Sequence, residues 1–283
     1  MTTVSIPTTV PAPKKRARGL TIAMRALSNS KIILSYGAFY AFFIAIVIGI
    51  LYPSISSINL NAYLTSNAVA GLLGAKLSNA NSFSALAALE LYSSLYALIW
   101  GGIIAYIAGS TVPAAIENGM LDLALARPIT RTRYYLEAWM SAAIGALILS
   151  IATFVAVWLS TLFVKNAGID WKWLVIAQSL ELAAMFLASG IGMLFGSFIN
   201  ASRAAGGAAI GILALFYLMN TLGGLSNNLS WMLKIEPIYY TQGIQALATH
   251  SITAWYPLVL VIGGLLCGLV GLVIFNKRDL PTV

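Results

Sequence analysis

Residues 257–275 read PLVLVIGGLLCGLVGLVIF, a run without a charged side chain. As an α-helix at 1.5 Å per residue, the run would be about 28 Å long, close to the roughly 30 Å hydrocarbon core of a bilayer. Its residues do not alternate between apolar and polar, so a membrane-barrel strand does not fit. In lipid every backbone N–H and C=O group needs an internal partner, which a helix provides. The run therefore predicts a transmembrane helix.

Five further apolar runs of similar length precede this one. The chain has 283 residues, of which 60% are hydrophobic and 8% are charged, whereas a soluble domain carries about 25% charged residues. A surface so poor in charge requires lipid as its solvent. The sequence thus predicts an all-α, polytopic membrane protein with six transmembrane helices, at about residues 32–52, 89–108, 139–164, 173–199, 205–225 and 257–275.

The basic residues predict how the chain is oriented, because Lys and Arg are enriched in cytoplasmic loops. With six spans, both termini lie on one side, together with the second–third and fourth–fifth connections. That side collects twelve basic residues, against four on the other: Lys14, Lys15, Arg16, Arg18, Arg25, Lys31, Arg127, Arg131, Arg133, Arg203, Lys277 and Arg278 against Lys76, Lys165, Lys172 and Lys234. We expect a multi-pass protein of the plasma membrane with cytoplasmic N and C termini.

Three segments outside the spans have their own character. Residues 1–18 are rich in Thr, Pro and basic residues and predict a disordered, basic cytoplasmic arm before a transmembrane domain at 19–283. Residues 19–31 place Arg25 and Lys31 among apolar residues such as Leu20 and Leu27, as a short amphipathic helix lying at the membrane interface would. Residues 226–256 are too polar to span and too apolar for a plain loop, so we expect outer re-entrant helices between the fifth and sixth spans.

Composition also limits the partners and cofactors. The basic residues that give the net charge of +8 are scattered over short loops and termini and are not interleaved with aromatic residues. This pattern favours binding to lipid headgroups over binding to nucleic acid. Cys267 is the only cysteine, which excludes an intrachain disulfide. His250 is the only histidine and has no clustered carboxylates in the sequence, so we predict no metal site.

The connection between the second and third spans is the most informative. Pro113 suits the first turn of a helix, acidic residues follow at 117 and 122, and Pro128 ends the helix because a proline disfavours helical geometry in the residue before it. Thr130 or Thr132 can then cap the next span. We expect a short cytoplasmic helix from Glu117 to Ala126, flanked by arginines, that serves as a docking surface.

The order Glu117-x-Gly119-x-x-x-x-x-Leu-x-Arg127-Pro128-Ile-x-Arg131 resembles the signature of type 2 ATP-binding-cassette (ABC) transporter permeases, and residues 275–280 (FNKRDL) resemble the close of these permeases. The resemblance implies a permease subunit, more often an exporter, that pairs with a second copy or a paralogous permease. A separate ATPase, which holds the ATP and Mg²⁺, would dock on the 114–133 loop. The coupling residues that it implies are Glu117, Asn118, Gly119, Asp122, Arg127, Pro128 and Arg131.

The chain itself lacks nucleotide-binding machinery, since none of its eight lysines follows a glycine as a phosphate-binding loop requires. We therefore expect no enzyme activity and no cofactor on this chain. A non-transporting membrane anchor or assembly subunit is the alternative. An intramembrane hydrolase is disfavoured, because one histidine and no Gly-x-Ser-x-Gly motif leave no recognisable nucleophile and base.

Two carboxylates are candidates for a transport pathway. Glu181 is predicted in mid-span, where lipid exposure would cost about 2.5–3.5 kcal/mol, so it should face the bundle; a bond to a neighbouring helix is its structural alternative. Glu90 is predicted to begin the second span, where a capping or snorkelling role competes with transport. Three Gly-x-x-x-Gly pairs, at 192–196, 207–211 and 264–268, predict close helix contacts.

Overall fold

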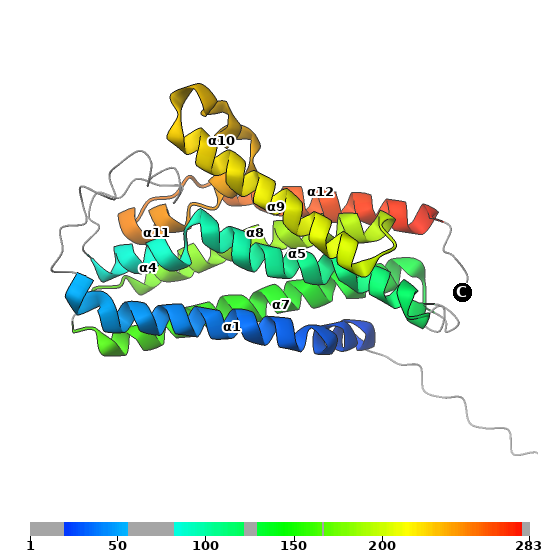
Figure 1. The fold of residues 1–283 in the computed structure, drawn as a ribbon, viewed down its shortest axis with the longest axis horizontal. Helices are drawn as coiled ribbons and strands as arrows, with labels where there is room; N and C mark the ends of the chain where they lie inside the picture. Colours follow the sequence, from blue (N-terminus) through cyan, green and yellow to red (C-terminus); the bar gives the residue numbers. More distant parts are fainter. Residues whose placement is uncertain (1–19, 56–81, 122–128, 166, 279–283) are drawn as a thin grey trace, which may run out of the picture.

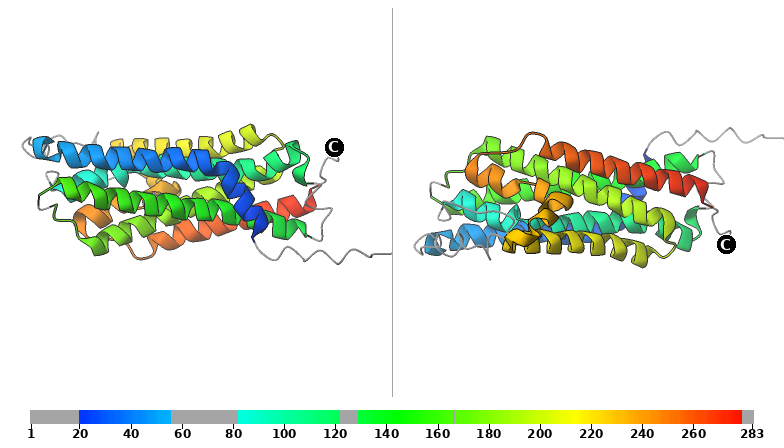
Figure 2. Two further views of the ribbon diagram at one scale, coloured as in Figure 1. Left: turned by 90° about the horizontal axis from the view of Figure 1, so that it is seen from below. Right: turned by 90° about the horizontal axis from the view of Figure 1, so that it is seen from above.

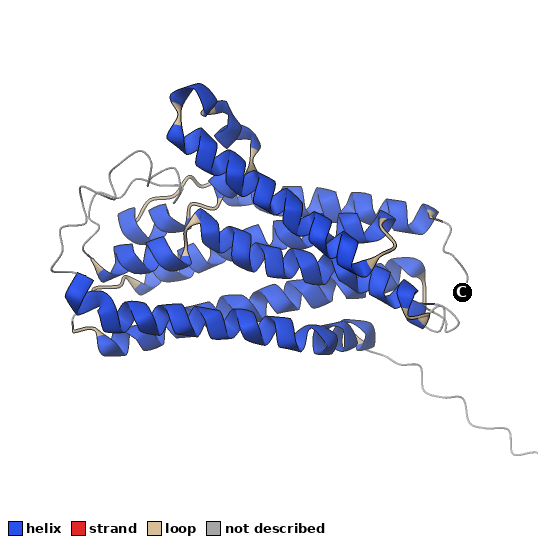
Figure 3. Ribbon diagram, in the orientation of Figure 1, coloured by secondary structure: helices blue, strands red, loops and turns tan. Residues whose placement is uncertain are grey.

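The computed structural model describes residues 20–55, 82–121, 129–165 and 167–278, and these contain helices and no strands (Figure 3). Six helices within them are long and apolar enough to cross a membrane. The prediction of an all-helical chain with six helices long and apolar enough to span a membrane is confirmed for the described residues. The helices are α1 (Thr21–Ile55), α5 (Ser94–Glu117), α7 (Arg131–Ser160, continued by the 3₁₀ turn η1, Thr161–Phe163), α8 (Trp171–Phe198), α9 (Ser202–Leu225) and α12 (Tyr256–Lys277).

Helices α5 and α8 form the centre of the bundle. Of the most apolar window of each, 61% of the residues are buried, against 22% in α9, 28% in α12 and 33% in α1. Helix α8 packs against α5 and α12, α5 also packs against α9, and α1 packs mainly against α7. Since lipid tails are as apolar as leucine, the exposed apolar faces of α1, α9 and α12 are compatible with a bilayer around them.

The six helices alternate in direction, so the start of α1 and the end of α12 lie at the same end of the bundle (Figure 1). We call this the basic end: α1, α7 and α9 begin there, and α5, α8 and α12 end there. The opposite end is called the far end. Helix α9 leans away from the bundle towards the far end, where it carries α10 (Trp231–Ile235).

Short helices gather at the far end. Helix α4 (Phe83–Leu91) precedes α5, and the connection from α9 to α12 contains η2 (Asn227–Leu229), α10, η3 (Pro237–Tyr240) and α11 (Gly243–Thr249). Short helices were predicted for this connection and are present. Their re-entry into the membrane stays a prediction.

The first span differs from its prediction. The interfacial helix expected at 19–31 and the span expected at 32–52 form one continuous helix, α1, which also passes Pro53 and ends at Ile55. Figure 2 shows that the first turns of α1 lie at an angle to the rest of it. The described part of α1 before Gly37 contains neither glycine nor proline, so the hydrogen-bonded helix is not interrupted there. The predicted arm at 1–18 lies outside the described residues.

The second span and the predicted docking helix need correction. The chain breaks at Tyr92 and Ser93, so α5 begins at Ser94 rather than at 89, and it runs on to Glu117 rather than ending at 108. Pro113 is inside α5, not in the first turn of a new helix. Pro113 has no N–H to donate to the carbonyl one turn earlier, so α5 lacks that one bond but continues past it.

Candidate functional site

The described part of the predicted docking loop begins where α5 ends. Asn118 and Gly119 form a turn, with Gly119 at φ +62° in the left-handed region that suits glycine, and Met120 and Leu121 are helical again. Helical geometry therefore resumes at Met120, three residues after the expected start at Glu117, and the predicted helix beyond Leu121 lies outside the described residues. The predicted coupling residues Asp122, Arg127 and Pro128 lie outside the described residues.

Glu117 holds the start of α9. Its carboxylate accepts hydrogen bonds from the backbone N–H of Ser202, at 3.0 Å, and from the Ser202 hydroxyl. The residue before α9, Ala201, has no side chain that could cap the helix. A carboxylate is unfavourable at the C-terminal end of its own helix and favourable at the N-terminus of another. Glu117 thus supplies from α5 the cap that the sequence of α9 lacks.

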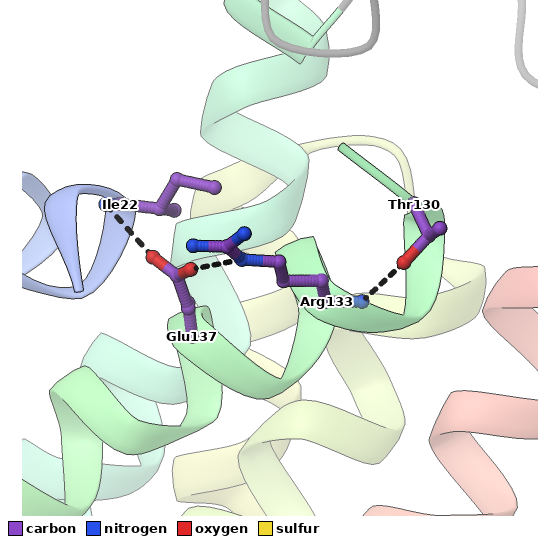
Figure 4. Close-up of polar contacts among 4 residues, drawn as sticks. All are labelled: Ile22, Thr130, Arg133 and Glu137. Carbon is purple, nitrogen blue, oxygen red and sulfur yellow. Dashed lines mark hydrogen bonds and ion pairs between the residues drawn. The ribbon is translucent and has the colours of Figure 1, made fainter. Parts of the chain in front are cut away.

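Glu137 holds the start of α1 in the same way. One carboxylate oxygen accepts from the backbone N–H of Ile22 at 3.0 Å, and the other accepts from Nε of Arg133 at 2.8 Å (Figure 4). Glu137 is 4% exposed. About two turns earlier, the Thr130 hydroxyl caps α7 by accepting from the N–H of Arg133. The predicted cap at Thr130 is confirmed.

Two arginines donate hydrogen bonds to backbone carbonyls at the C-terminal ends of helices. Arg278 donates from Nη1 to the carbonyl of Ser197 in the last turn of α8, at 3.1 Å. Arg131 donates from Nη1 to the carbonyl of Arg278, just past the end of α12, at 2.8 Å. Positive groups are favourable at C-terminal carbonyls. Asn276 and Thr132 add a side-chain contact between α12 and α7.

All six spanning helices therefore take part in cross-links at the basic end. Glu117 joins α5 to α9, Glu137 joins α7 to α1, and the two arginines join α7 to α12 and α12 to α8. Glu117 and Arg131 lie at the two ends of the connection between α5 and α7, which is the predicted docking loop. A displacement of that loop can therefore be passed to the other four helices through charged and hydrogen-bonded groups.

The described coupling candidates contact different elements of the chain, and no hydrogen bond or ion pair within the described ranges joins Glu117 to Arg131 directly. Glu117 and Arg131 are engaged within the chain, whereas Asn118 is exposed and bonds only the Ala114 carbonyl of its own helix. Glu137 was missed, because the third span was expected to begin at 139. The signal that identifies it is the spacing of Arg133 and Glu137, four residues apart on one helix face.

The two pathway candidates lie far from this site. Glu90 is exposed on α4 and does not begin the second span, which corrects that expectation. Glu181 is fully buried, about 15 Å along α8 from Trp171, and faces the bundle as predicted. Neither of its carboxyl oxygens has a hydrogen-bond partner among the described residues. A pathway role for either residue stays a prediction.

A buried polar network accompanies Glu181. Gln178, one turn earlier on α8, accepts from the Tyr92 hydroxyl at 2.8 Å and donates to Ser150 at 3.0 Å and to Tyr96 at 3.3 Å. It thereby connects α8 to α5, α7 and the break before α5. No group of three or more His, Cys, Asp or Glu side chains within the described ranges could hold a metal ion. His250 stacks on Trp173, with ring centroids 5.4 Å apart.

Comparison with known proteins adds no identification. No protein-family model matches the chain, and no curated protein is similar enough to be counted as a relative.

The Glu137 cross-link makes a stability prediction. Glu137→Ala removes the cap of α1 and the partner of Arg133, and we expect a loss of about 1–2 kcal/mol, because a helix cap contributes about 1 kcal/mol and the ion pair is half in solvent. Lys277→Ala, at an exposed cation of the same end, should change stability by less than about 0.5 kcal/mol. Thermal unfolding of the two variants in detergent measures the difference; equal values would contradict the capping role.

Proposed function

We propose that this chain is the membrane subunit of an ATP-driven transporter of the type 2 ABC permease kind, an exporter that works as a dimer with a second permease copy. A separate ATPase docks on the 114–133 loop at the basic end, which faces the cytoplasm in the plasma membrane. The observation that carries the proposal is the set of cross-links at the basic end, since they connect this loop to every other spanning helix. The resemblance of residues 117–131 to the permease signature supports it.

The mechanism follows from those contacts. When the ATPase closes around ATP, it displaces the connection between α5 and α7. Glu117 then moves the start of α9, and Arg131 moves the ends of α12 and α8 through Arg278. Because short charged contacts are nearly rigid compared with apolar packing against lipid, the helices tilt together rather than singly.

A photo-crosslinking amino acid at Asn118, an exposed residue of the loop, tests the docking. In native membranes it should capture a protein that carries a Gly-x-x-x-x-Gly-Lys-Ser/Thr motif and hydrolyses ATP. The same amino acid at Ser251, which is exposed at the far end, is the matched control and should not capture it. Capture of a protein without that motif would favour a membrane anchor, and labelling of Asn118→Cys from outside intact cells would refute the docking.

A further inference from the structure

A cavity of about 730 Å³ lies at the basic end between α1, α5 and the start of α7. Along α1 its wall extends from Thr21 to Ile33, and along α5 from Asn118 back to Ile107. At 1.5 Å per residue each wall is roughly 17 Å long. The first turns of α1, which lie at an angle to the rest of that helix (Figure 2), contribute Thr21, Ile22 and Arg25 to the wall.

The chemistry of this wall changes along its length. Arg25, Asn29 and Asn118 lie towards the end of the bundle, whereas Ile33 and Ile107 lie deeper, within the apolar spans. Between these positions, the hydroxyls of Ser30, Ser110 and Thr111 each donate a hydrogen bond to a carbonyl of their own helix. The cavity thus has a polar, cationic mouth and an apolar inner end.

Arg25 is the only charged residue among the described residues of the wall, and the ion pair found within the described ranges, Arg133–Glu137, does not involve it. Tyr134, on α7, lines the same cavity and carries a hydroxyl group. A guanidinium with a neighbouring hydroxyl suits a phosphate, since arginine donates to phosphate oxygens in a planar fork.

From these observations we infer that the cavity binds one anionic phospholipid of the adjacent leaflet, with its phosphate at Arg25 and Tyr134 and one acyl chain between α1 and α5. The volume falls within the roughly 300–1,000 Å³ of sites that enclose small amphiphiles. A free phosphate or nucleotide would leave the apolar inner end unfilled. A zwitterionic lipid would add a positive group beside Arg25. The inference does not depend on the proposed transport function.

Native mass spectrometry of the full-length protein in detergent tests this site, with phosphatidylglycerol and phosphatidylcholine of identical acyl chains added in equal amounts. We expect the protein to retain phosphatidylglycerol selectively. Arg25→Gln should lower that selectivity about ten-fold, because a hydrogen bond to a charged group is lost. Arg25→Lys should keep part of it, and Lys277→Gln, an exposed cation of the same end outside the cavity wall, should not change it.

Two further measurements distinguish a bound lipid from a bound soluble anion. Ala114→Phe fills the cavity from α5 and should remove lipid retention without changing any charge. Millimolar inorganic phosphate should not displace the lipid, whereas displacement would identify a site for a soluble anion and overturn the proposal. Equal retention by the wild-type protein and Arg25→Gln would also overturn it. Monodisperse elution of each variant from gel filtration shows that it is folded.

Discussion

Gly192→Ala is expected to lower the melting temperature of the detergent-solubilised protein by about 5 °C or more. Gly192 is buried where α8 meets α5, and a methyl group there would overlap the carbonyl oxygen of Ala105, with the Ala108 methyl and the Gly109 amide close behind. A backbone oxygen cannot rotate away as a side chain can. The two central helices would have to separate, which also loosens the contact one turn later at Gly196.

Gly211→Ala is the matched control for this prediction. Gly211 belongs to another Gly-x-x-x-Gly pair, yet a methyl group there would meet nothing within 4 Å. Alanine is the better helix former by up to about 1 kcal/mol, so this variant should be as stable as the wild-type protein or slightly more stable. Similar melting temperatures for the two variants, measured by tryptophan fluorescence, would show that α5 and α8 do not approach this closely.

The second prediction is that the stability of the folded protein depends on pH through Glu236. This residue lies between α10 and η3, outside the spanning helices. Glu236 is fully buried and accepts hydrogen bonds from Asn220 and from the N–H of Ile238. Burial outweighs these bonds and raises the pKa of Glu236 from the usual 4.5 to about 7. The folded protein therefore favours the neutral carboxyl, whose proton could serve Asn220 Oδ1, an atom without a partner among the described residues.

The sign of the pH effect follows from the raised pKa. Stability from the neutral carboxyl is fully present below about pH 4.5 and is lost as the pH rises through about 7. The difference between these values corresponds to roughly 3 kcal/mol. The melting temperature should fall between about pH 5 and pH 8, and Glu236→Gln, which mimics the neutral acid, should remove most of that fall. Glu90→Gln, at an exposed carboxylate, should keep it, and identical pH profiles for all three proteins would contradict the prediction.

The three Gly-x-x-x-Gly pairs show where sequence reasoning reaches its limit. All three look alike in the sequence, but the pair at 192–196 contacts α5, and Gly264 and Gly268 contact Phe186 and Trp139. The pair at 207–211 faces away from the bundle. In lipid, an apolar face turned inward and one turned outward have the same composition, so hydrophobicity cannot distinguish them.

The sequence by itself determined that six helices span the membrane, because the length of an apolar run against the thickness of a bilayer is a local property. It also identified the basic end and limited the cap of α7 to Thr130 or Thr132, since both depend on near neighbours along the chain, and the structure decides for Thr130. Only the tertiary structure decided that α5 and α8 are central, that α5 passes through Pro113, and that Glu117 and Glu137 cap α9 and α1. The two caps join residues at least 85 positions apart. The central position of α5 and α8 and the passage through Pro113 depend on packed neighbours. Neither kind of contact leaves a periodic signal in a single sequence.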